Sequence, residues 1–138
     1  MSMTFDTKIA IFIRDDLEVW QKLNVTAFIA SALVGSDTSI VGENYGDASG
    51  NVYLPMVIQP MLVYQADADG IQKAYRRAMD RDVRLAIFTA DLFSTGNDID
   101  NRAAVANKTA DQLDLVGIAM RDFKKSVDKV TKGLRLHA

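Results

Sequence analysis

Three short apolar runs constrain the fold of this sequence more than any other feature. They are Lys8-Ile-Ala-Ile-Phe-Ile13, Val83-Arg-Leu-Ala-Ile-Phe-Thr89 and Leu115-Val-Gly-Ile-Ala-Met120. Runs of this kind, flanked by polar positions, are typical of strands that are buried on both faces. A strand without a polar face needs a layer of structure on each side, so we expect helices on both faces of a sheet.

The segments between these runs have the residue spacing of helices. We expect four helices, at residues 17–34, 67–81, from 95 to about 112, and 123–133. The second is the most regular, because Ile71, Ala74 and Ala78 repeat at i, i+3 and i+7. The first has little polar face, so it should be packed nearly all round.

A turn signal, Asp47-Ala-Ser-Gly50, lies between two segments that suit strands, 39–41 and 51–54. This pattern predicts a β-hairpin in which Gly50 supplies the positive φ angle. Regular pairing should resume after Pro60, in a strand at 61–64. The order of elements predicts a single domain over residues 1–138, with a three-layer α/β/α fold, a mixed, mostly parallel sheet and an inserted β-hairpin.

Composition excludes several kinds of site. The chain has no cysteine and one histidine, His137. It therefore lacks disulfides and thiol chemistry, and a multi-histidine metal centre or a Ser-His-Asp triad within one chain is disfavoured. We expect neither a metal nor a cofactor. No segment approaches the roughly 20 apolar residues that span a bilayer, and residues 1–6 do not resemble an export signal, so we expect a cytoplasmic protein without a membrane partner.

Polar side chains follow two of the predicted strands at their ends. If these strands run parallel, the turns after them open at the same edge of the sheet, where α/β folds bind ligands. Lys22 and Thr26 lie one helical turn apart near that edge. The residues in the two turns are Arg14, Asp15, Asp16, Thr89, Asp91, Ser94 and Thr95.

We predict a pocket at this edge in which Lys22 and Asp91 are catalytic. Lys22 would stabilise developing negative charge, and Asp91 would orient or deprotonate a nucleophile such as water. Each residue also has a purely structural alternative: the acidic residues and Thr95 can cap helices, and Lys22 can pair with Glu18 at i, i+4. The predicted ligand-binding residues are Asp16, Thr26, Thr89, Ser94 and Thr95.

Charge is spread unevenly along the chain. Residues 121–138 carry six basic and two acidic side chains, whereas the remaining residues carry ten basic and sixteen acidic ones. Lys125, Lys129 and Lys132 lie at i, i+4 and i+7 and form a row that could contact phosphates. Lysines in a final helix also complement its dipole, which is the alternative explanation.

Both ends of the chain resemble peptidyl-tRNA hydrolase II. The apolar strand that leads through Arg14-Asp-Asp-Leu17 to Lys22 is similar to the start of that family, and 115–120 with Val127-Asp-Lys-Val-Thr-Lys-Gly-Leu-Arg-Leu136 is similar to its end. The chain is closer still to an uncharacterised bacterial family, the domain of unknown function numbered two thousand, in which Trp20-Gln-Lys-Leu-Asn-Val-Thr26, Tyr53-Leu-Pro-Met56 and Lys132-Gly-Leu-Arg-Leu-His137 look typical. The resemblance implies a peptidyl-tRNA hydrolase II-like fold.

The resemblance carries over only some of the hydrolase residues. Lys22 matches the lysine that opens the hydrolase helix, and Asp91 stands in for the aspartate of its loop. Thr26 stands where that family has a glutamine, and Ile29 stands where it has a histidine. Two groups that could orient water or bond the ester are therefore missing.

Three functions remain open from the sequence. The first is the binding or processing of a small ligand near Lys22. The second is cleavage of the ester between peptide and tRNA, with the lysine row gripping the tRNA, a partner that the acidic remainder of the chain disfavours. The third is a non-catalytic interaction domain that forms a homodimer through Val52–Met61.

Overall fold

The computed structural model describes residues 4–138 and contains a five-stranded sheet in the order β5-β6-β1-β4-β7. Residues 1–3, which belong to the segment where we expect no export signal, lie outside the described residues. The strands of this sheet are β1 (Thr7–Arg14), β4 (Met61–Ala66), β5 (Leu85–Thr89), β6 (Leu115–Phe123) and β7 (Arg135–Leu136). The helices are α1 (Val19–Ser36), α2 (Ala68–Asp80), α3 (Asp98–Ala106) and α4 (Lys124–Thr131).

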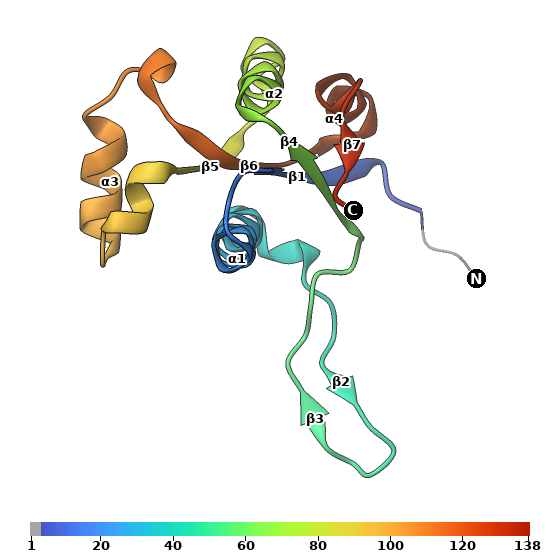
Figure 1. Cartoon of the computed structure of the whole chain (residues 1–138). Coiled ribbons are helices and arrows are strands. Elements are labelled where there is room, and N and C mark those ends of the chain that lie inside the picture. The colour runs from blue at the N-terminus through green and yellow to red at the C-terminus, as the bar shows by residue number, and fades with distance from the viewer. Residues whose placement is uncertain (1–3) are drawn as a thin grey trace.

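Helices cover both faces of the sheet, as the apolar runs predict (Figure 1). α1 lies on one face, and α2 and α4 lie on the other. β1 contributes to both cores by alternation: Ile9, Ile11 and Ile13 face α1, whereas Ala10 and Phe12 face α2 and α4. All five side chains are buried. The three-layer α/β/α prediction is confirmed.

The sheet is mixed, as predicted, but the prediction that it is mostly parallel is wrong. Among the described strands only β1 and β4 pair in parallel, whereas the β1–β6, β5–β6 and β4–β7 pairs are antiparallel. The reason is α3, which lies beyond the β5 edge of the sheet and does not cross a face (Figure 1). β6 therefore begins at the end of the sheet where β5 finishes, and it runs antiparallel to β5.

β1, β4 and β5 nevertheless point the same way. This follows because β6 is antiparallel to both of its neighbours, and β4 is parallel to β1. Their last residues, Arg14, Ala66 and Thr89, therefore lie at one edge, which we call the strand-end edge. The turns that follow β1 and β5 open there, as expected.

The predicted hairpin is present, with its first strand shifted along the chain. β2 (Tyr45–Gly46) pairs antiparallel with β3 (Val52–Tyr53), whereas most of the segment 39–41, expected to be the first strand, is a 3₁₀ helix. Gly50 has a φ of 87° in the turn, as predicted. We call residues 42–58 the arm. It projects from the body on the side of the sheet that carries α1 (Figure 1).

Asp47 closes the tip of the arm. Its Oδ1 accepts from the backbone amides of Ser49 (2.8 Å) and Asn51 (3.0 Å). Its Oδ2 accepts from the side chain of Asn51 (3.0 Å) and the hydroxyl of Tyr53 (2.6 Å). These bonds, the one from Tyr53 above all, lower the pKa of Asp47 to about 2. The arm is therefore held in shape by its own contacts.

The expectation that α1 is packed nearly all round is wrong. Its buried residues, Val25, Ile29 and Leu33, face the sheet. Four large apolar side chains of α1 are nevertheless 56–72% exposed, and two of them, Trp20 and Phe28, also lie against Phe93 and Phe88. We call these four the outer face of α1: Val19, Trp20, Leu23 and Phe28. Even so, none of the helices within residues 4–138 has the length and apolar character that crossing a membrane requires.

Gly117 of β6 lets α1 approach the sheet closely. A methyl group at this position would lie 2.5 Å from Cγ1 of Val25 and 3.3 Å from Cδ1 of Ile29. Val25 is fully buried and β-branched, so it cannot move aside easily. We expect Gly117→Ala to lower the free energy of unfolding by about 1–3 kcal/mol, measured by urea denaturation.

The matched control is Gly35→Ala, near the end of α1, where a methyl group would meet nothing within 4 Å. We expect this variant to be as stable as the wild type or more stable by about 0.5–1 kcal/mol, because alanine favours the helix. Equal stability of the two variants would contradict the close approach at Gly117.

The bonds to Asp47 make the arm sensitive to acid. A carboxyl whose pKa is lowered by folding contributes stability above its ordinary pKa of 3.8, and this contribution is lost as the pH falls towards about 2. We expect the side-chain carboxyl resonance of Asp47 to titrate with a midpoint near pH 2 in an NMR experiment. Tyr53→Phe removes the largest contribution and should raise the midpoint. An ordinary midpoint in the wild type would show that the tip is open.

Candidate functional site

Arg14, the last residue of β1, organises the strand-end edge. Its guanidinium donates to Asp16 (Nε to Oδ1, 2.7 Å) and to Asp114 (Nη1 to Oδ1, 2.6 Å). Partial burial lowers the pKa of Arg14, but the two carboxylates outweigh this effect and raise the pKa above its ordinary value. The carboxylate of Asp16, a predicted ligand-binding residue, is therefore engaged in an ion-pair cluster that ties the end of β1 to the start of β6.

Lys22 lies near the start of α1 and forms no ion pair with any residue of 4–138. Glu18, its alternative partner, forms a capping box with Gln21, whose side chain accepts from the Glu18 amide at 2.9 Å. The Lys22–Glu18 ion pair is therefore not formed. The ammonium nitrogen of Lys22 lies instead 3.2 Å from Nε2 of His137.

His137 is held beside Lys22 by its backbone and by its ring. Its backbone amide donates to the carbonyl of Val63 (2.9 Å), which extends the pairing of β7 with β4. Its Nδ1 lies 2.9 Å from the carbonyl oxygen of Ala138. Because an ammonium has no lone pair and a carbonyl has no proton to donate, Nε2 accepts from Lys22 and Nδ1–H donates to Ala138.

A separate polar cavity of about 420 Å³ opens at the same end of the strands; Asp15 and Asp67 line it, whereas Lys22 and His137 do not. Gln65 of β4 and Arg135 of β7 line it and face each other across the strand pair. Alternation along the strands puts both on the same side of the sheet as His137. Arg135 forms no ion pair with any residue of 4–138. We call Lys22 and His137, together with Arg135 and its cross-strand neighbour Gln65, the basic cluster.

Asp91 is not part of this cluster. Its Oδ2 pairs with Nζ of Lys108 at 2.7 Å, in the segment after α3. Lys22 contacts His137, which follows β7, whereas Asp91 follows β5. β7 and β5 are the two outermost strands of the sheet. Four inter-strand spacings of about 4.8 Å each separate β5 from β7. Lys22 and Asp91 therefore contact different partners, His137 and Lys108, and their sharing of one cavity stays a prediction.

The other predicted ligand-binding residues make contacts within the fold. The hydroxyl of Thr26 donates to a backbone carbonyl one turn earlier in α1, at 2.7 Å. Thr95 bonds to the side chain of Asn101, and Ser94 is exposed at the end of a 3₁₀ helix. Thr89 is buried, and its hydroxyl has no hydrogen-bond partner among the described residues. Thr89 ends β5, and Ser94 and Thr95 follow it, so all three lie on the Asp91 side.

An aromatic groove of about 630 Å³ lies between α1, β5 and α3. Phe28 and Phe88 line it, with their ring centroids 6.1 Å apart, and a smaller cavity continues it past Thr95. The charged side chains of its wall, Asp98 and Arg102, pair with each other at 2.8 Å. The groove therefore offers apolar surface without a free charge.

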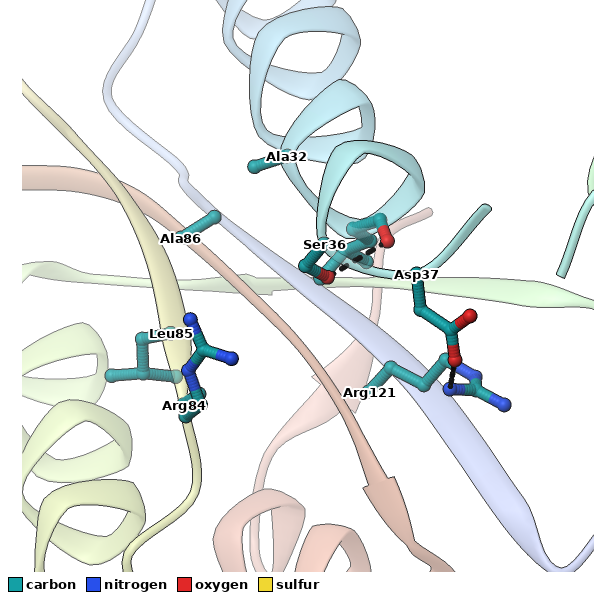
Figure 2. Close-up of a pocket in the computed structure, with 8 residues that line it drawn as sticks. Ala32, Ser36, Asp37, Arg84, Leu85, Ala86 and Arg121 are labelled. Carbon is teal, nitrogen blue, oxygen red and sulfur yellow. Dashed lines mark hydrogen bonds and ion pairs between the residues drawn. The ribbon is translucent and has the colours of Figure 1, made fainter. Parts of the chain in front are cut away.

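A further cavity, of about 410 Å³, lies beside the C-terminus of α1 (Figure 2). Arg84 and Arg121 lie on opposite sides of it. Arg121 pairs with Asp37 at 3.2 Å and donates to Gln59 at 3.1 Å. The last turn of α1 has no basic residue of its own, so these arginines offset the negative end of the helix dipole. Arg121 is therefore engaged by Asp37, whereas Arg84, Lys22 and Arg135 form no ion pair with any residue of 4–138.

The chain matches known proteins over almost its whole length. The model of a family described as "Protein of unknown function (DUF2000)" matches residues 7–138. The chain belongs to this family. A solved structure, described as the protein of unknown function Atu0240 from Agrobacterium tumefaciens strain C58, is 46% identical with a TM-score of 0.95, and the match covers 98% of this chain and 100% of that one. No curated protein matches the chain.

Three residues of the basic cluster in this DUF2000 chain, Gln65, Arg135 and His137, are not among the predicted site residues. The signal that could have found Arg135 and His137 is the segment 132–137, which contains the only histidine. Lys22 lies 115 residues away from His137, and neither segment by itself predicts that they meet. Within residues 4–138, no group of three or more His, Cys, Asp or Glu side chains could hold a metal ion.

Proposed function

We propose that this DUF2000 chain binds a small anion, a carboxylate or a phosphate monoester, at the basic cluster. The proposal rests on the contact between Lys22 and His137, in which Nζ of Lys22 lies 3.2 Å from Nε2 of His137. No carboxylate within residues 4–138 pairs with this ammonium. A partly buried ammonium is stabilised most by an opposite charge, and a ligand can supply that charge.

The cluster has free donors for such an anion. Lys22 has three N–H groups, and His137 occupies one of them. Arg135 adds a guanidinium, a group that binds carboxylates and phosphates through two parallel bonds. The N-terminus of α1 lies nearby, and its dipole favours negative charge. A bound anion would therefore offset the cost of placing a lysine at this end of the helix.

His137 provides the cluster with an acid–base group. Its Nε2 accepts from Lys22 through a lone pair. An anion that draws the ammonium of Lys22 away leaves the lone pair of Nε2 free to take a proton. We therefore propose for His137 the proton-transfer role that the sequence suggested for Asp91. Lys22 keeps its predicted role of stabilising negative charge.

Cleavage of peptidyl-tRNA is not the function that this geometry favours. Ile29, at the position of the hydrolase histidine, is 2% exposed and packs in the core on the α1 side of the sheet. Thr26, at the position of the glutamine, donates its hydroxyl to the helix backbone. Neither position offers a free polar group to an ester or to a water molecule.

Lys22→Gln tests the proposal, because it removes the charge and keeps a polar side chain. We expect inorganic phosphate and acetate, titrated into the wild type, to shift the amide resonances of β4 and β7 in NMR spectra. Lys22→Gln should bind both anions about 10- to 100-fold more weakly, because a hydrogen bond to a charged group contributes about 1.5–3 kcal/mol.

The matched control is Lys73→Gln on α2, which makes the same change of charge at an exposed lysine without an ion pair among residues 4–138. It should bind like the wild type. Equal weakening in the two variants would show a non-specific charge effect, and no binding by the wild type at millimolar concentrations would refute the site.

A further inference from the structure

The arm exposes an unusual amount of apolar surface for a segment that projects into solvent. Six of its large apolar side chains are 46–85% exposed. Its two acidic residues are Glu43 and Asp47, and Asp47 is used to close the tip. The six side chains are Tyr45, Val52, Tyr53, Leu54, Met56 and Ile58.

The outer face of α1 is a second largely exposed apolar surface, and Phe28 at its side also borders the aromatic groove. Its four side chains lie on a helix of 18 residues whose only charged residue is Lys22. Lys22 points towards His137 and so does not interrupt this face. A helix that is apolar on both sides is normally covered on both sides.

The arm and the outer face of α1 lie on the same side of the sheet (Figure 1). The arm extends past α1 and away from the body, so most of its surface does not pack on its own helix. In a pair of chains related by a two-fold axis, the arm of each chain can contact the helix of the other. Such an interface is self-complementary, because the same two surfaces are used twice.

The area available is sufficient for a stable dimer. A large apolar side chain offers roughly 150–200 Å², so ten such side chains, 46–85% exposed, present on the order of 1,000 Å² per chain. A standard interface buries about 800 Å² on each partner. The contacts of Asp47 also hold the arm in shape before it binds, which reduces the entropy lost on association.

From these observations we infer that two copies of this chain form a dimer in which the arm of each copy packs on the outer face of α1 of the other. The partner is a second copy because one chain carries both apolar surfaces. The interface does not use the basic cluster, so this inference is independent of the proposed anion site.

Three single variants test the dimer by size-exclusion chromatography with light scattering and by sedimentation velocity. The wild type should have about twice the chain mass of 15.2 kDa at micromolar concentration. Leu54→Glu in the arm and Leu23→Glu on α1 should each weaken the dimer at least 100-fold. Ile99→Glu on α3, 78% exposed and outside both surfaces, is the matched control and should remain dimeric. Circular dichroism and thermal melting check that each variant is folded.

Cross-linking tests which surfaces meet, because the chain has no cysteine of its own. A mixture of Leu54→Cys and Leu23→Cys chains, treated with a short bismaleimide, should give a covalent heterodimer, whereas Leu54→Cys mixed with Ile99→Cys should not. A wild type that stays monomeric at 100 micromolar or above, a dimer that survives both glutamate variants, or cross-linking through Ile99 in place of Leu23 would each overturn the inference.

Discussion

The burial of β1 on both faces and along both edges is the constraint on which the rest of the structure depends. Residues 9–13 are all fully buried, and the backbone of the strand pairs with β4 on one side and with β6 on the other. A strand that reaches water neither through its side chains nor through its backbone requires two helical layers and two neighbouring strands. The close approach of α1 at Gly117 shows how tightly one of these layers is seated.

The same constraint moves all polar chemistry to the ends of the strands and to the edges of the sheet. Arg14, where β1 leaves the core, is occupied by ion pairs that join β1 to β6. Basic groups without an ion pair among the described residues lie instead beside β4 and β7, where the short last strand pairs with β4. The proposed anion site is therefore a consequence of how the sheet ends on that side.

α1 connects the core, the proposed site and the proposed dimer surface. One face of the helix packs on the sheet through Val25, Ile29 and Leu33, its start presents Lys22 to His137, and its outer face is left apolar. The sequence pattern of α1 predicted an almost fully buried helix. That pattern is explained if a second copy of the chain covers the face that its own chain leaves exposed.

The sequence by itself determined the local elements and the layers, because these depend on neighbouring residues. Apolar runs predict buried strands, the 3–4 spacing of Ile71, Ala74 and Ala78 predicts α2, and Asp47 to Gly50 predicts the turn of the arm. Only the tertiary structure decided the direction of β6, which follows from the position of α3 outside the sheet. It also decided which distant side chains meet: Lys22 reaches His137 and not Asp91 because β7 adds to the sheet next to β4. Such pairings depend on the sum of many long-range contacts, and no local pattern of residues encodes that sum.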